Sequence, residues 1–114
     1  MQRLAILALL AGLAGCTGGG GAACRPAGAV LENTSSLAVE QAFLAPNAGA
    51  GWGPDLLGQA PALPAGGRMP LAIDGPGPWR LRLVWVNGRA IELDGIDGCR
   101  AGRIILSDNV LTAE

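Results

Sequence analysis

Cys16 is the residue of this chain whose surroundings imply a specific chemistry. It ends the run Leu13-Ala14-Gly15-Cys16, which follows an uncharged apolar segment that starts at Leu4. A membrane-spanning helix needs about 20 apolar residues, so this shorter segment fits the core of a signal peptide. Small residues directly before a cysteine have the form of a bacterial lipobox. We therefore expect residues 1–15 to be cleaved and the Cys16 thiol to carry lipid.

An ordinary signal peptide is the alternative, with a chance cysteine or a cleavage site near Gly21-Ala22-Ala23. A lipoprotein cysteine carries two or three acyl chains, and each buried methylene contributes about 0.8 kcal/mol, so such an anchor is effectively permanent. Thr17 stands where an Asp would indicate retention at the inner membrane. We therefore expect the protein at the periplasmic face of the outer membrane, with that membrane as its partner through the lipid on Cys16.

Cys24 and Cys99 are the two cysteines that remain once Cys16 is lipidated. An even pair in a small exported domain predicts one disulfide, because the periplasm is oxidising. Two free thiols are the alternative. The bridge would close a long loop and contribute up to about 4 kcal/mol in the chain-entropy model.

Composition predicts one small domain and excludes several activities. Residues 16–23 are the lipidated cysteine and a Gly-rich tether, and residues 24–114 form the domain. Without Arg3, seven Arg face nine acidic residues, so nucleic-acid binding is not expected. The chain has no His and no Lys, which removes His-based catalytic triads, His-ligated zinc and Schiff-base chemistry. We expect no enzyme, no cofactor and no metal.

Short apolar segments between Gly, Pro, Asn and Asp predict an all-β fold, a small β-sandwich of about six to seven strands. Strands are expected at residues 29–33, 69–74 and 103–107, with turns at residues 63–66, 74–78 and 94–98. Pro70 assigns its strand to a sheet edge. Residues 46–67 are expected to form a long ordered loop, and the tail from residue 108 to fray.

Residues 37–45 are compatible with two elements. Leu37, Val39 and Phe43 alternate with smaller or polar residues, as on one face of a half-buried strand. The segment also has good helix propensity, and Ser36 is a suitable N-cap. Because Pro46 ends the segment after nine residues, its length favours the strand.

Residues 79–94 predict a β-hairpin closed near Asn87-Gly88, with one apolar face formed by Trp79, Leu81, Leu83 and Trp85. A two-residue turn would set Leu83 opposite Glu92 and bring charge onto that face. A three-residue loop at residues 86–88 instead pairs Leu83 with Ile91, Leu81 with Leu93 and Arg82 with Glu92. We therefore predict this longer loop, with Gly88 in the left-handed bulge position.

Trp52 and Asp55 are the candidate ligand-binding residues. Trp52 could stack a sugar while Asp55 accepts hydroxyl hydrogen bonds. The structural alternative, which we favour, has Trp52 closing the end of the sandwich and Asp55 capping a short turn at Leu56-Leu57.

Other polar residues have ordinary structural interpretations. Asp94, Asp97 and Asp108 offer oxygen ligands for Ca²⁺, but Asp-Gly pairs are common turn formers and the spacing of an EF-hand loop is missing. Arg80 and Arg82, opposite Glu92, form either a partner-binding face or a solvated face with weak ion pairs.

Several motifs resemble a group of small exported bacterial β-modules that are usually labelled only hypothetical proteins or putative lipoproteins. The similarity spans roughly residues 29–107 and rests on Trp52-Gly53-Pro54-Asp55-Leu56-Leu57-Gly58, Leu63-Pro64-Ala65-Gly66, Trp79-Arg80-Leu81-Arg82, Gly88 and Ile96-Asp97-Gly98-Cys99. It implies a strand at residues 37–45 and no activity. Related sequences carry a cysteine just before the strand that begins here at Trp79. This chain has Gly77-Pro78 there, so Cys24 would serve instead.

The expected function is that of a lipid-anchored periplasmic binding or accessory module without catalytic activity. An envelope protein is the expected partner. A purely structural envelope lipoprotein is one alternative. A module that binds a glycan or peptidoglycan through Trp52 is another.

Overall fold

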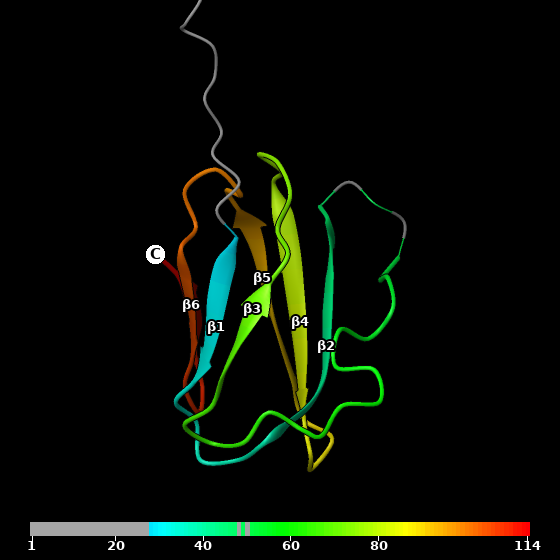
Figure 1. The fold of residues 1–114 in the computed structure, drawn as a ribbon, viewed down its shortest axis with the longest axis vertical. Coiled ribbons are helices and arrows are strands. Elements are labelled where there is room, and N and C mark those ends of the chain that lie inside the picture. Colours follow the sequence, from blue (N-terminus) through cyan, green and yellow to red (C-terminus); the bar gives the residue numbers. More distant parts are fainter. Residues whose placement is uncertain (1–27, 48, 50) are drawn as a thin grey trace, which may run out of the picture.

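The computed structural model describes residues 28–47, 49 and 51–114. Cys16, Cys24 and the expected tether lie outside these residues. The described part is all-β, as predicted, with seven strands in two sheets that pack as a β-sandwich (Figure 1). The strands are β1 (Ala29–Asn33), β2 (Val39–Pro46), β3 (Arg68–Leu71), β4 (Trp79–Trp85), β5 (Ala90–Ile96), β6 (Arg103–Leu106) and β7 (Leu111–Ala113).

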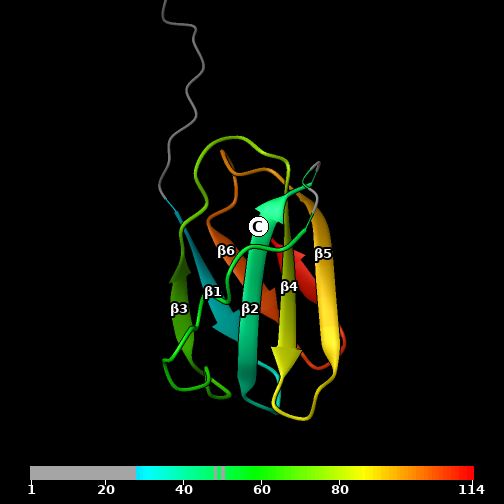
Figure 2. The same cartoon turned by 90° about the vertical axis from the view of Figure 1, so that its right-hand side faces the viewer.

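One sheet has the order β3-β1-β6-β7, and the other has the order β2-β4-β5 (Figure 2). All neighbouring strands are antiparallel except β1 and β6, which run parallel with Leu31 beside Ile104. β3 is an edge strand, as Pro70 predicted, although it ends at Leu71 rather than at Asp74. No helix of the described residues has the length and apolar character needed to cross a membrane.

The core lies between the sheets and follows from two-residue alternation along the strands. Leu31, Ile104 and Leu106 point inward from one sheet and have no exposed surface. Leu81, Leu83 and Trp85 face them from the other sheet and are at most 1% exposed. The apolar face predicted for the segment from Trp79 to Trp85 is therefore confirmed.

The β4–β5 hairpin has the predicted register. Leu83 lies opposite Ile91, Leu81 opposite Leu93 and Arg82 opposite Glu92. The three-residue loop is closed by hydrogen bonds from Gly88 N to Trp85 O (2.8 Å) and from Trp85 N to Arg89 O (2.8 Å). Gly88 has φ = 89°, the left-handed conformation that this loop requires.

Residues 37–45 contribute a strand, β2, but its faces differ from the prediction. A bulge between Val39 and Gln41 shifts the register against β4. After the bulge, Ala42 is fully buried and Phe43 turns to the half-buried outer side. Placing Phe43 on the core face was wrong because one extra residue in a strand reverses the side that all later residues face.

Two expectations about the C-terminal third were also wrong. β5 continues past Asp94 to the buried Ile96, because a register shift near Gly95 brings Ile96 opposite Trp79. The tail does not fray: β7 pairs with β6, and Arg103 and Glu114 exchange backbone hydrogen bonds of 3.0 and 2.8 Å. β6 is therefore not the last strand.

A buried polar cluster around Asn33 joins the two sheets. The Asn33 amide group donates to the carbonyls of Leu37 (2.9 Å), Leu63 (3.1 Å) and Pro64 (3.2 Å). Its side-chain oxygen accepts from the backbone N–H (3.0 Å) and the hydroxyl of Ser35. The Ser35 oxygen in turn accepts the indole N–H of Trp85 on β4 at 2.9 Å. The cluster satisfies polar groups that the sandwich removes from water.

We predict that Asn33→Ala lowers the free energy of unfolding by about 2–4 kcal/mol, since the buried Ser35 N–H would lose its acceptor and three carbonyls would each lose one of two donors. Urea denaturation followed by Trp fluorescence measures this loss. The matched control is Glu40→Ala on β2, where the side chain is exposed and the change should stay within about 0.5 kcal/mol. Equal effects of the two substitutions would contradict the role assigned to Asn33.

Candidate functional site

The lipidation and disulfide candidates are only partly within the described residues. Cys16 and Cys24 lie outside them, whereas Cys99 lies within them. Cys99 is half-buried in the turn that links β5 to β6. Its backbone N–H donates to Asp97 Oδ1 at 2.9 Å, and the N–H groups of Arg100 and Ala101 donate to Asp97 O at 3.0 and 2.9 Å. Asp97 thus organises the turn that carries this cysteine.

This turn packs closely against the segment that precedes β4. Gly98 N donates to Pro76 O at 2.9 Å, and Trp79 Nε1 donates to Gly75 O at 3.0 Å. A Cβ atom at Gly98 would collide with the Gly75 carbonyl and with Ile73. The position of Cys99 is therefore determined by close backbone packing.

Trp52 lies on the outer face of the β2-β4-β5 sheet. The Arg80 guanidinium carbon is 4.3 Å from the centroid of its ring, and the ring of Phe43 is 6.5 Å away at an angle of 50°. Arg80 belongs to the face of β4 opposite the buried Leu81 and Leu83. The expectation that Trp52 closes the end of the sandwich was wrong, because this cation–π contact and Phe43 hold it on the outside of a sheet.

Asp55 caps a turn, as the structural alternative predicted. Its Oδ1 accepts the backbone N–H groups of Leu57 and Ala42, both at 3.0 Å. The second bond joins the long loop to β2, and Leu56 N to Ala42 O (2.7 Å) reinforces it. One carboxylate oxygen is thus occupied by the backbone, while Trp52 packs against Arg80. The two residues have separate structural contacts.

The three aspartates considered for Ca²⁺ have separate surroundings. Asp97 is in the turn that carries Cys99, and its Oδ2 lies 3.6 Å from Arg100 Nε. Asp108 Oδ1 accepts hydrogen bonds from the backbone N–H (2.7 Å) and the hydroxyl (2.8 Å) of Ser36. Asp94 lies on β5. In residues 28–47, 49 and 51–114, no three His, Cys, Asp or Glu residues gather as a metal site would require.

Arg82 and Glu92 pair across the outer face of the hairpin, with Nη1 and Oε2 2.6 Å apart. Arg82 is also the cross-strand neighbour of Phe43 on β2. An exposed pair of this kind contributes at most about 1 kcal/mol. The pair therefore shows which face of the sheet is exposed to solvent, and it adds little to the stability of the fold.

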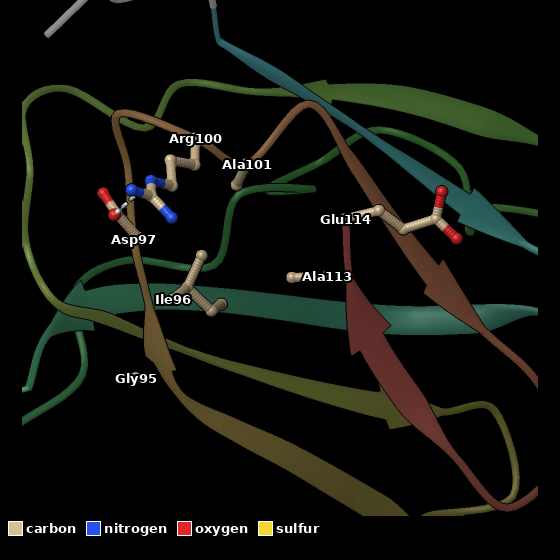
Figure 3. A pocket seen from close by; sticks show the side chains of 7 residues that line it. All are labelled: Gly95, Ile96, Asp97, Arg100, Ala101, Ala113 and Glu114. Atoms are coloured by element: carbon tan, nitrogen blue, oxygen red, sulfur yellow. Dashed lines mark ion pairs between the residues drawn. The ribbon is translucent and has the colours of Figure 1, made fainter.

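A cavity of about 220 Å³ opens at one side of the sandwich, where the end of β5 lies near the end of β7 (Figure 3). Its lining residues are Gly95, Ile96, Asp97, Arg100, Ala101, Ala113 and Glu114. Ile96 and two alanines supply apolar surface, while the Asp97–Arg100 pair and Glu114 supply charge. The arrangement suits one apolar side chain with a polar neighbour.

The sequence did not predict that Phe43 packs against Trp52 or that Ala113 lines the cavity. The bulge in β2 that turns Phe43 outward has no sequence signal. The alternation of Leu111, Thr112 and Ala113 was a signal for a strand, but three residues are too few to predict one.

Glu114 also belongs to an ion-pair network on the outside of the other sheet. Arg103 donates to both carboxylate oxygens of Glu32 at 3.1 Å, and to Glu114 Oε1 at 3.1 Å. The hydrogen bonds from Arg103 hold the pKa of Glu32 below its ordinary value of 4.5. At Asp108, the backbone N–H and then the hydroxyl of Ser36 lower the carboxyl pKa in the same way.

Comparison with known proteins adds no family: no protein-family model, no curated protein and no solved structure matches the chain. The resemblance to small exported β-modules stays a prediction.

We predict that Glu32 contributes stability above about pH 4.5 and that this contribution is lost on acidification. A carboxyl group whose pKa is lower in the folded state keeps its full effect above the unfolded pKa and loses it as the pH falls through the folded pKa. The free energy of unfolding of the wild type should therefore fall more steeply than that of Glu32→Gln between about pH 5 and pH 3. Urea titrations at several pH values measure both slopes. Parallel curves would contradict the prediction.

Proposed function

We propose that the chain is a lipid-anchored module of the bacterial envelope that acts by surface contact rather than by catalysis. The observation that carries the proposal is Leu13-Ala14-Gly15-Cys16, placed after a short uncharged apolar segment. A cysteine that carries two or three acyl chains would hold the module on the membrane. Thr17 supports the periplasmic face of the outer membrane as its location.

A disulfide between Cys24 and Cys99 is part of this proposal. Val30 N donates to Gly102 O at 3.0 Å, so the start of β1 lies beside the segment that follows Cys99. Cys24 is five residues before β1 and Cys99 is three residues before Gly102, which are short distances along the chain. The bridge would join the segment after the anchor to the Cys99 turn.

The side chains on the surface of the domain bear on which kind of partner it binds. The described domain is a small β-sandwich in which seven of fifteen charged side chains form ion pairs with one another. The contacts of Trp52 and Asp55 supply a structural reason for both residues, so glycan binding is the less favoured alternative. We therefore favour an envelope protein as the partner.

Intact-mass spectrometry of the membrane-extracted protein tests the anchor and the bridge together. After alkylation without reduction, we expect a chain that begins at Cys16, carries acyl chains and has no alkyl group. Cys16→Ser should abolish the lipid mass and release the protein from the membrane fraction. A wild-type chain without lipid would refute the anchor. Two alkylated cysteines would refute the bridge.

The binding role is tested by photo-crosslinking in the bacterium that produces the protein. Photoreactive residues are needed because the chain has no Lys for amine-reactive reagents. The photoreactive residue is placed in turn at four exposed positions: Val30, Glu40, Glu92 and Val110. We expect the positions on one face of the domain to yield a discrete adduct with one envelope protein.

Adducts from no position would favour a purely structural lipoprotein. A shift of intrinsic Trp fluorescence on adding peptidoglycan fragments to the wild type, lost in Trp52→Leu, would favour the glycan-binding module. Either result would overturn the proposed protein partner.

A further inference from the structure

β5 is the long strand edge that the described residues leave open. Each sheet has two edge strands, and three of the four are short or covered. β3 has four residues and contains Pro70, and β7 has three residues. β2 is covered by the long loop through the backbone bridge between Val39 and Leu63. β5 has seven residues, and Figure 2 shows it as the outermost strand of its sheet.

The register of the hairpin identifies the backbone groups that point away from the sheet. Trp85 N bonds to Arg89 O, so that pair is hydrogen-bonded across the hairpin. In an antiparallel pair, hydrogen-bonded and non-hydrogen-bonded positions alternate. Ile91 and Leu93 therefore bond to β4, whereas the N–H and C=O groups of Ala90 and Glu92 point outward. An open row of this kind is a template for another strand.

The side chains along β5 specify the chemistry of such a strand. Glu92 is on the solvent face with its carboxylate 2.6 Å from Arg82, and Asp94 follows two residues later on that face. Ile91 and Leu93 are half-buried and pack against the core. An added strand would meet Asp94 and the Arg82-paired Glu92 on one side, and Ile91 and Leu93 on the other. Basic and apolar residues in alternation match this pattern.

The cavity at the end of β5 adds a second element of recognition. It lies at the end of β5, where Ile96 and Ala113 both line it (Figure 3). A cavity of about 150 Å³ can hold a benzene ring. At about 220 Å³, this cavity has room for one aromatic or large aliphatic side chain of an added strand.

In the register centred on Glu92, a second copy of the chain fits this edge poorly. Antiparallel pairing of two β5 strands about Glu92 would set Glu92 directly opposite the same residue of the other copy. Like charges directly opposite each other destabilise a strand pair. The charges of β5 therefore favour a different polypeptide over self-association.

We infer that β5 binds, by strand addition, an extended segment of another protein in which basic and apolar residues alternate, with one apolar side chain entering the cavity beside Ile96. This inference rests on the proposed role as a binding module and names the surface that performs it. The backbone of the edge would supply affinity, while Glu92, Asp94 and the cavity would supply selectivity.

The test measures binding of a synthetic peptide that alternates arginine with valine and has one phenylalanine among its apolar positions. The full chain is titrated by calorimetry with this peptide and with a control peptide in which glutamate replaces every arginine. We expect the basic peptide to bind at least about tenfold more tightly than the acidic one.

Glu92→Pro is the decisive variant, because proline removes an outward N–H while the β4 pairing of Ile91 and Leu93 is retained. Glu92→Thr is its matched control, since it removes the same charge and ion pair but keeps the N–H. We expect Glu92→Pro to weaken peptide binding at least about tenfold more than Glu92→Thr. Ala90→Pro repeats the test if Glu92→Pro does not fold, as judged by the fluorescence of the buried Trp85.

Equal binding of both peptides, or equal binding by folded Glu92→Pro and Glu92→Thr, would overturn the assignment of β5. So would a dimer in sedimentation analysis that Glu92→Pro abolishes, since the edge would then bind a second copy. If crosslinking yields an adduct but the peptide does not bind at β5, the protein is a binding module that uses another surface. Peptide binding without any cellular adduct would support the edge and count against the proposed envelope partner.

Discussion

The buried hydrogen bonds of Asn33 are the interaction on which the rest of the sandwich depends. This residue ends β1, and its amide group bonds to the β1–β2 connection and to the segment at Leu63 and Pro64. Through Ser35 it also reaches the ring nitrogen of Trp85 in the other sheet. A buried polar group is costly unless it has a partner, and the buried Ser35 N–H has its acceptor in Asn33, so one side chain bonds three segments together.

The opposite end of the sandwich is organised by backbone packing instead. There Gly98 lies so close to the Gly75 carbonyl that no side chain fits, and Asp97 closes the turn that carries Cys99. The chain also enters β1 at this end (Figure 1). In the proposed arrangement, the anchor and the disulfide would act at this end, while the β5 edge runs along the side of the domain.

Local bulges explain why the site differs from its prediction. Alternation predicted both faces of β4 correctly, because that strand is regular from Leu81 to Trp85. The same rule failed in β2, where one shift in register turned Phe43 outward against Trp52. A bulge gives no periodic signal, since it changes which side a residue faces without changing the kind of residue. The outer-face contact between Trp52 and Arg80 therefore emerged only in three dimensions.

The sequence by itself determined the all-β class, the register of the β4–β5 hairpin and the edge position of β3. These features depend on neighbours in the chain: apolar alternation, the length of the Asn87-Gly88 loop and the missing N–H of Pro70. Its Leu13-Ala14-Gly15-Cys16 run is also the basis of the proposed anchor. Tertiary structure decided the strand order, the strand at the C-terminus, the role of Asn33 and the open edge of β5. Each of these depends on which distant segment lies alongside, and local pattern carries no information about that.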